Sequence, residues 1–150
     1  MSMEVDKVKI QTLYQQKING WNSGNGDKFA EPYTDDSDYI GFDGTHLKGR
    51  KEISLFHQML FDKFLRGSRL IGKIKNIRFP TSDVAIIVAI GGTIEAGQVD
   101  INPNRNSIHT IVAVKQNNKW AFSSFQNTRA QYIGRPEMIE AFTRELAQER

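Results

Sequence analysis

His109 is the residue of this chain whose type and place in the sequence best suit chemistry. An imidazole donates or accepts a proton near neutral pH, which makes a histidine a candidate general acid or base. His109 belongs to the stretch 105–129, R-N-S-I-H-T-I-V-A-V-K-Q-N-N-K-W-A-F-S-S-F-Q-N-T-R, which predicts two strands joined by a tight turn at Asn117 and Asn118. Asparagine tolerates the positive φ angles that such a turn needs. We therefore expect a β-hairpin with His109 on its first strand.

The predicted turn also fixes which residues of the hairpin lie opposite each other. Counting outward from it, one face carries Lys115 with Trp120, Ala113 with Phe122, Ile111 with Ser124 and His109 with Gln126. The other face carries Val114 with Ala121, Val112 with Ser123, Thr110 with Phe125 and Ile108 with Asn127. Both faces are largely apolar, so both must be covered. The histidine opposite a glutamine is where we first expect a ligand.

Two interpretations of His109 are open at this point. In one, the imidazole is a catalytic acid or base. In the other, Gln126 and a neighbouring hydroxyl satisfy its ring nitrogens, and the histidine only shapes the interior. Asp43 is a second acid–base candidate, because it follows Tyr39 and Gly41 on one strand face. Asp43-Gly44 is also an ordinary turn sequence, which explains the aspartate without chemistry.

Four aromatic residues are candidates for contact with a ligand. Tyr14, Trp21, Tyr39 and Phe56 combine apolar rings with polar tips that can orient a small molecule. Packing alone also explains aromatic residues at helical spacing.

The sequence gives no sign of a metal or a cofactor. The three histidines, His46, His57 and His109, show no i, i+4 spacing and no neighbouring carboxylate cluster, so no metal site is predicted. The glycine-rich motifs of nucleotide binding and the nucleophile elbow of hydrolases are missing from the sequence. The absence of cysteine excludes a thiol nucleophile. We expect a protein that works without a cofactor.

The elements that must position these residues follow from hydrophobic spacing. The expected helices are 5–21, 27–33, 50–65 and 135–149, and the expected strands before the hairpin are 38–42, 69–79 and 83–95. Ile53, Phe56, Leu60, Phe61 and Phe64 form the apolar face of the third helix. The order predicts an α+β domain with a mostly antiparallel sheet and helices packed on one side.

Length and charge narrow the function classes further. A chain of 150 residues is enough for a single domain with a core. Its net charge of +3 comes from 20 basic and 17 acidic residues that are well mixed, so nucleic acid is not an expected partner. No apolar run approaches the ~20 residues that a membrane span needs. The first residues lack the apolar core of a signal peptide, and we expect a cytoplasmic protein.

Several short segments together resemble a known family. They are Gly20-Trp21-Asn22 followed by Gly26-Asp27, Tyr33-Thr34-Asp35-Asp36, Gly49-Arg50-Lys51-Glu52-Ile53, and the closing F-Q-N-T-R of 125–129. In order and spacing they are similar to the nuclear-transport-factor-2-like superfamily (SnoaL-like, ketosteroid-isomerase-like), and within it to the SgcJ/EcaC group. The resemblance covers about residues 5–130 and leaves the last helix outside.

The resemblance implies a cone, in which a strongly curved sheet wraps around helices and encloses an apolar pocket. It also implies a homodimer through the outer face of the sheet, with Ile108, Thr110, Val112, Val114 and Phe125 at the contact. The row of His109, Ser124 and Gln126 would then face the pocket.

The chemistry of the isomerase branch does not carry over. The resemblance places its carboxylate base at Gly41 and its oxyanion tyrosine at Lys17, and neither residue matches. The histidine usual in the last strand of the SgcJ/EcaC group is Gln126 here, which forms hydrogen bonds but does not shuttle protons. Steroid isomerisation is therefore not expected.

Two functions of different classes remain. In the first, the conical pocket binds a small, mainly apolar molecule, and any catalysis is cofactor-independent proton transfer on a carbonyl or polyketide-like substrate at His109. In the second, the protein is a dimerisation or association module without activity. The extra helix 135–149 favours the second, because its apolar stripe of Met138 or Ile139, Phe142 and Leu146 must dock somewhere.

Overall fold

The computed structural model describes residues 3–150, and in that range it has four α-helices, one 3-10 helix and a six-stranded sheet. In chain order the elements are α1 (Met3–Asn22), α2 (Gly26–Ala30), β1 (Tyr33–Ile40), β2 (His46–Lys48), α3 (Gly49–Asp62), β3 (Arg69–Thr81), β4 (Val84–Ile94), η1 (Pro103–Arg105), β5 (Ser107–Gln116), β6 (Lys119–Arg129) and α4 (Pro136–Ala147). The strand order is β2-β1-β6-β5-β4-β3, with only β1 and β6 parallel among these neighbours. The predicted α+β class with a mostly antiparallel sheet is confirmed.

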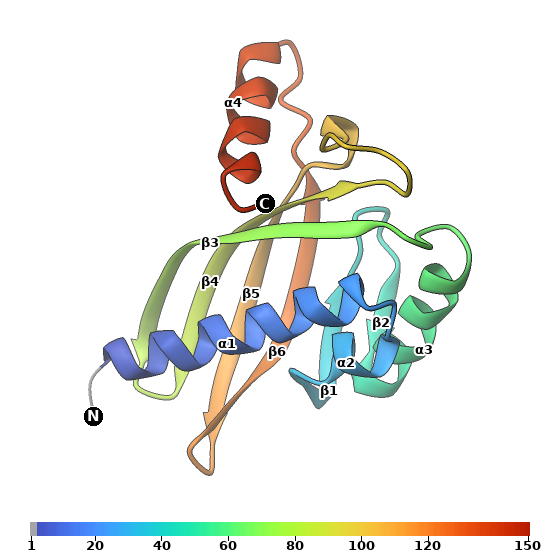
Figure 1. Cartoon of the computed structure of the whole chain (residues 1–150). Coiled ribbons are helices and arrows are strands. Elements are labelled where there is room, and N and C mark those ends of the chain that lie inside the picture. Colours follow the sequence, from blue (N-terminus) through green and yellow to red (C-terminus); the bar gives the residue numbers. More distant parts are fainter. Residues whose placement is uncertain (1–2) are drawn as a thin grey trace.

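Helix α1 fills the concave side of the sheet. Figure 1 shows strands β3 to β6 bending behind α1, with α2 and α3 beside β1 and β2. The buried residues Ile10, Tyr14 and Ile18 recur every fourth position, so they form one stripe of α1 and join the main core with Ile87 and Ile111. Helix α1 thereby covers the concave face of the sheet, and the opposite face points away from the main core.

Helix α3 ends earlier than the sequence predicts. The helix was expected to include Phe64 in its apolar face, but it stops at Asp62. The backbone N–H groups of Lys63 and Leu65 both donate to the carbonyl oxygen of Leu60, which closes the helix with a tight turn. As a result Phe64 is 82% exposed, and its assignment to the buried face was wrong.

The hairpin turn has the predicted form. Asn117 and Asn118 have φ angles of 53° and 62°, and β5 and β6 begin pairing on either side of them. The predicted pairs Lys115 with Trp120 and Ala113 with Phe122 are confirmed. Near the turn, the side chains of the hairpin therefore face as expected.

Beyond Ala113 the predicted register is wrong, because β6 contains a bulge. Ala113 pairs with Phe122 but Val112 pairs with Ser124, so Ser123 is an extra residue in β6. One extra residue moves every later side chain of that strand to the opposite face. His109 consequently lies opposite Asn127 and not opposite Gln126.

Because of the bulge, three residues of β6 lie on the face opposite to the predicted one. Ser124 and Gln126 pair with Val112 and Thr110 on the outer face, so they do not belong to the inner row of His109. Phe125, expected on the outer face, is 1% exposed and lies in the core. The outer placement of Ile108, Thr110, Val112 and Val114 agrees with the structure, in which all four are exposed or half-buried.

Helix α4 covers one end of the outer side of the sheet. Its buried residues Phe142 and Leu146 pack in a second core cluster with Ile71, Ile90, Ile94 and Ile101. Glu145 adds ion pairs from α4 to Lys73 and Lys75 on β3, at 3.1 Å and 2.6 Å. The apolar stripe of this helix is therefore docked on its own chain.

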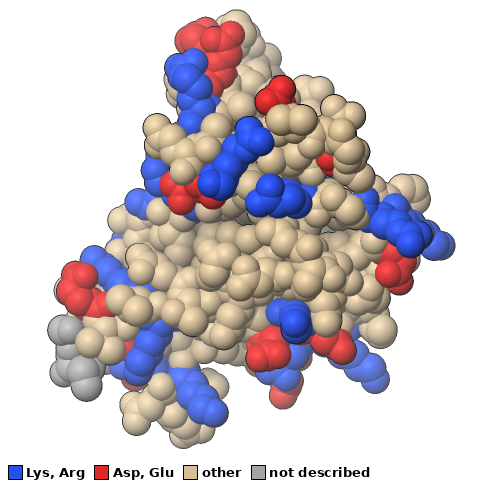
Figure 2. Space-filling model, viewed as in Figure 1, with Lys and Arg blue, Asp and Glu red and all other residues tan. Residues whose placement is uncertain are grey.

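Charged residues of both signs are spread over the surface. Figure 2 shows Lys, Arg, Asp and Glu interspersed around an uncharged band on the face that it presents. Within residues 3–150, no helix is long and apolar enough to cross a membrane.

Candidate functional site

A cavity of about 190 Å³ lies between the helices and the inner face of the sheet. Residues of α1, α2 and α3 line one side of it, and residues of all six strands line the other. Most of the lining is apolar and aromatic. The polar groups that reach it are Lys17, His57, Thr93, Ser107, His109 and Asn127 inside, with Asp43, Thr45, Arg105 and Arg129 at the mouth.

Three of the four predicted aromatic residues line the cavity. Trp21, Tyr39 and Phe56 are part of its wall. The indole N–H of Trp21 donates to Ser68 Oγ at 3.0 Å, and the ring of Tyr39 stacks on Phe125 with centroids 4.4 Å apart. Tyr14 is absent from the wall formed by the described residues, and its hydroxyl donates to Ile90 O at 3.4 Å. Packing explains the position of Tyr14.

His109 lines the cavity as predicted and is 6% exposed. Its Nε2 lies 2.9 Å from Ser107 Oγ, while Nδ1 has no hydrogen-bond partner within residues 3–150. A Cβ on Gly91 of the neighbouring strand would lie 2.8 Å from the imidazole, so glycine makes room for this ring. Burial, and then the nearby Lys17, lower the pKa of His109 well below its usual value. The ring is therefore neutral at pH 7, and it is a weaker base than an exposed imidazole.

His57 is a second buried imidazole in the wall, and the sequence did not identify it. It occupies the apolar face of α3 between Ile53 and Phe61 and is 3% exposed. Its Nδ1 donates to Ile53 O at 2.8 Å, which leaves Nε2 of the neutral ring as an acceptor. Burial lowers the pKa of His57 to about 4, with Lys17 adding to the effect.

Lys17 is the third polar group of the interior, and it too was missed as a site residue. It lies on α1 one turn beyond Tyr14 and is 3% exposed. Its Nζ is 3.5 Å from the ring centroid of Phe125. Burial lowers the pKa of Lys17 well below its usual value. In the sequence Lys17 stands beside Tyr14 and Ile18 of the apolar stripe, a position that by itself does not indicate burial of the amine.

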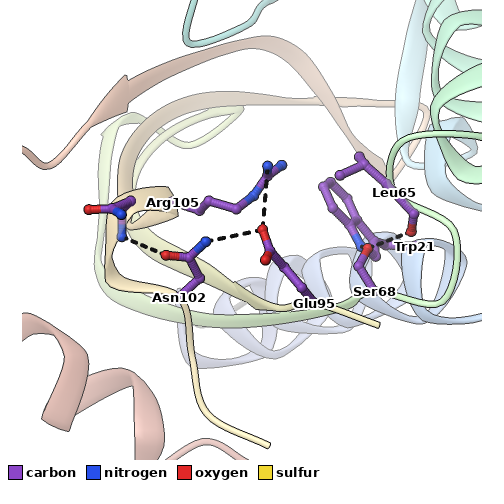
Figure 3. Close-up of polar contacts among 7 residues, drawn as sticks. Trp21, Leu65, Ser68, Glu95, Asn102 and Arg105 are labelled. Carbon is purple, nitrogen blue, oxygen red and sulfur yellow. Dashed lines mark hydrogen bonds and ion pairs between the residues drawn. The ribbon is translucent and has the colours of Figure 1, made fainter. Parts of the chain in front are cut away.

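Two arginines mark the mouth of the cavity, where it meets an open groove lined by Gly41, Phe42, Asp43, Arg105, Asn127 and Arg129 among others. The guanidinium of Arg129 lies 3.8 Å above the ring of Phe42. Figure 3 shows the guanidinium of Arg105 next to Glu95, which also accepts a hydrogen bond from Asn102. Burial and the nearby Arg105 lower the pKa of Arg129. The mouth therefore carries charges of both signs, with Glu95 close to Arg105 and Asp43 close to Arg129.

Asp43 is at the mouth but is held as a turn residue. Its Oδ1 accepts hydrogen bonds from Thr45 N at 3.0 Å and from Thr45 Oγ1 at 2.7 Å. These bonds lower the pKa of Asp43, which makes its carboxylate a weaker base. The geometry favours the turn interpretation over the acid–base one.

Several solved protein structures are similar to this chain. No protein-family model and no curated protein matches the sequence. A domain of unknown function with a cystatin-like fold, from Nostoc punctiforme PCC 73102, is 36% identical with a TM-score of 0.84, covering 91% of this chain and 85% of that one. An NTF-2-like protein of unknown function from Shewanella oneidensis MR-1 is 17% identical with a TM-score of 0.69, covering 82% and 98%.

An enzyme is also among the structural neighbours. Hexachlorocyclohexane dehydrochlorinase LinA-type3 from Novosphingobium barchaimii LL02 is 13% identical with a TM-score of 0.72, covering 85% of this chain and 88% of that one. At this level of identity the likeness concerns the fold alone.

Proposed function

The chain belongs to the nuclear-transport-factor-2-like superfamily, and on this basis we propose that its cavity binds a small, mainly apolar organic molecule. One observation carries the proposal: an apolar, aromatic-lined cavity into which a few buried polar side chains converge. Such a combination is typical of small-molecule sites, since the apolar wall supplies affinity and the polar groups orient the ligand.

The volume of the cavity limits the ligand. At about 190 Å³ it is somewhat larger than the roughly 150 Å³ apolar cavity that admits benzene in another protein. A ligand with one six-membered ring fits this space. A larger molecule would place one ring inside and extend through the mouth between Arg105 and Arg129.

Cofactor-independent proton transfer on a carbonyl compound is the enzymatic form of this proposal. His109 would be the base, because its neutral ring lines the cavity and its buried Nδ1 has no hydrogen-bond partner among residues 3–150. The dehydrochlorinase among the neighbours supports only the general point that this fold serves enzymes. A more specific form of the proposal is that the chain belongs to the SgcJ/EcaC group and acts on a polyketide-like substrate. This form rests on the F-Q-N-T-R ending.

A cyclic alcohol tests ligand binding. We expect cyclohexanol to shift the indole N–H resonance of Trp21, which lines the cavity, in a saturable manner at millimolar concentration. The indole of Trp120 is the matched control, because it donates to Asp6 away from the cavity. Resonances that stay unmoved at saturation, or that move equally, would contradict the proposal.

Deuterium exchange tests the catalytic form. Cyclohexanone in D₂O should exchange its α-protons faster in the presence of the protein, and His109→Ala should reduce this acceleration by about 10²-fold or more. An unchanged rate in a folded His109→Ala variant would exclude His109 as the base. Retained cyclohexanol binding would leave the binding function in place.

The outer face of the sheet supports a homodimer as the second component of the proposal. The outward strip combines apolar residues of two neighbouring strands: Ile108, Val112 and Val114 on β5, and Ile86 and Val88 on β4. Helices α1, α2 and α3 lie on the other face of the sheet. Burying this apolar strip against a second copy would be favourable. Val112→Glu should yield a folded monomer in a measurement of mass in solution, while Thr12→Glu on the exposed side of α1, across the sheet from this strip, serves as a charge control. If binding and exchange both fail and the dimer remains, the association module is the better account.

A further inference from the structure

Lys17 lies inside the molecule in a cage of aromatic rings. Its Nζ is 3.5 Å from the ring centroid of Phe125, and 5.4 Å to 5.7 Å from the centroids of Phe29, Tyr33 and Tyr39. The side chain is 3% exposed and forms part of the cavity wall. A primary amine is thus presented to an apolar space that is large enough for a one-ring molecule.

The surroundings of Lys17 do not balance a positive charge. Throughout residues 3–150, no carboxylate oxygen lies within 4.0 Å of its Nζ. The phenols nearby stay neutral, since burial raises the pKa of Tyr33 and Tyr39. A desolvated cation–π contact contributes about 2 kcal/mol or more, and burying an ammonium ion costs several kcal/mol. Burial lowers the pKa of Lys17 well below its usual value, so this amine loses its proton more readily than an exposed lysine does.

A neutral, buried amine is a nucleophile toward carbonyl carbon. Lysines that are desolvated in apolar pockets react in this way because their lone pair is free at neutral pH. His57 and His109 share the cavity with Lys17, and both rings are neutral. Either can pass protons between nitrogen and oxygen during such a reaction.

We propose that Lys17 forms a Schiff base with a small aldehyde or ketone bound in the cavity. The proposal rests on the proposed function, since it needs a ligand in that space. The lone pair of Nζ attacks the carbonyl carbon, and a proton moves from nitrogen to oxygen to give a carbinolamine. Loss of the hydroxyl with the second nitrogen proton releases one water and leaves a carbon–nitrogen double bond. Neither oxidant nor reductant is consumed.

Reductive trapping tests the proposal on the intact wild-type protein. The full chain is incubated with cyclohexanone and sodium cyanoborohydride at pH 6.5, digested, and mapped by mass spectrometry for N-cyclohexyl lysine. Exposed lysines with a pKa near 10.4 are free amines in only about one molecule in 10⁴ at this pH. Lys28 and Lys119 are exposed and serve as internal references. We expect Lys17 to be labelled at least about tenfold faster than these two.

Two variants and a matched ligand complete the experiment. Lys17→Met and Lys17→Arg should lose the adduct on the peptide that contains position 17, while the labelling of Lys28 stays the same. Cyclohexanol, which has no carbonyl group, should slow the trapping by competition. Labelling of Lys17 at the rate of the exposed lysines would overturn the proposal.

The two proposals fail in different ways. If cyclohexanol shifts the Trp21 resonance but cyclohexanone gives no adduct at Lys17, the Schiff base is excluded and the binding function stands. If neither ligand affects the Trp21 resonance and no adduct forms, the Schiff base is excluded together with the binding function on which it rests.

Discussion

Two lysines lie near opposite ends of α1, and their surroundings differ. Lys115, on β5, is 3.5 Å from Asp6 and 4.0 Å from Asp83, and its Nζ lies 5.5 Å from the ring centroid of Trp120. The indole of Trp120 also donates to Asp6 at 2.9 Å, so the acid has two partners. Lys17 has aromatic rings close to its amine and, among the described residues, no such acid.

The difference shows how the same side chain serves two purposes. Around Lys115 opposite charges are close together, and part of the side chain reaches water, so the lysine can stay charged at low cost. Around Lys17 every neighbour is neutral, so the region is stable only while its ionisable groups remain uncharged. We therefore call these the ion-pair region (Asp6, Asp83, Lys115, Trp120) and the neutral region (Lys17, His57, His109, Tyr39).

Acid should produce the largest effect and should act first on the neutral region. His57 has a pKa of about 4 in the folded protein against 6.5 when unfolded, so the unfolded state binds the proton more readily. The contribution of neutral His57 to stability is complete above pH 6.5. It decreases as pH falls below 6.5 and is lost as pH falls through about 4. The loss from His57 amounts to about 3 kcal/mol of the free energy of unfolding. Urea unfolding at pH 7 and pH 4 measures it.

The variant His57→Gln is the control for the acid effect. A glutamine keeps a polar, neutral side chain, so the variant should lose less stability than the wild type between pH 7 and pH 4. His109 titrates in the same direction and accounts for part of the loss that remains. Equal losses in the two proteins would show that His57 is not held neutral.

The two tryptophans offer the next contrast. In Trp120→Phe the buried carboxylate of Asp6 loses its indole donor, so we expect a loss of about 2 kcal/mol in the free energy of unfolding. In Trp21→Phe the lost partner is Ser68, whose hydroxyl still donates to Leu65 O at 2.7 Å, so the cost should be smaller. Chemical denaturation of both variants measures the difference. A larger loss in Trp21→Phe would show that the bond from Trp120 to Asp6 is not the stronger of the two indole hydrogen bonds.

The sequence predicted the framework better than the interior. Hydrophobic spacing and turn residues indicated the helices, the class of the sheet and the turn at Asn117, because these depend on neighbours along the chain. The bulge at Ser123 could not be predicted, since a single extra residue costs little and depends on the curvature of the whole sheet. It reversed the faces of Ser124, Phe125 and Gln126.

Lys17 was missed for a different physical reason. A lysine near an apolar stripe usually extends its chain to place the amine in water, so the pattern of α1 gave no reason to expect burial. The cage became apparent only from the rings of Phe29, Tyr39 and Phe125, which come from three other elements. Residues brought together by tertiary structure in this way leave no spacing to detect.

Replacing Lys17 should stabilise the protein. Lys17→Met keeps the length of the side chain and removes a group that burial disfavours, so we expect a gain of about 1–2 kcal/mol at pH 7. Because the pKa of Lys17 is lowered on folding, the unfolded wild type binds more protons, and its stability rises with pH. The gain in the variant should therefore shrink as pH approaches about 10.4, the value of the unfolded lysine. A gain that is constant between pH 7 and pH 10 would mean that Lys17 is charged when folded.

Lys115→Met should have the opposite sign and the smallest size. The substitution leaves Asp6 with Trp120 as its remaining partner, so the melting temperature should fall by about 2–4 °C. Because 18% of the lysine side chain is exposed, salt screens the pair, and the fall should diminish in 1 M NaCl. The effect of Lys17→Met should not depend on salt, since that amine has no charge to screen. Equal salt dependence in the two variants would remove the distinction between the ion-pair region and the neutral region.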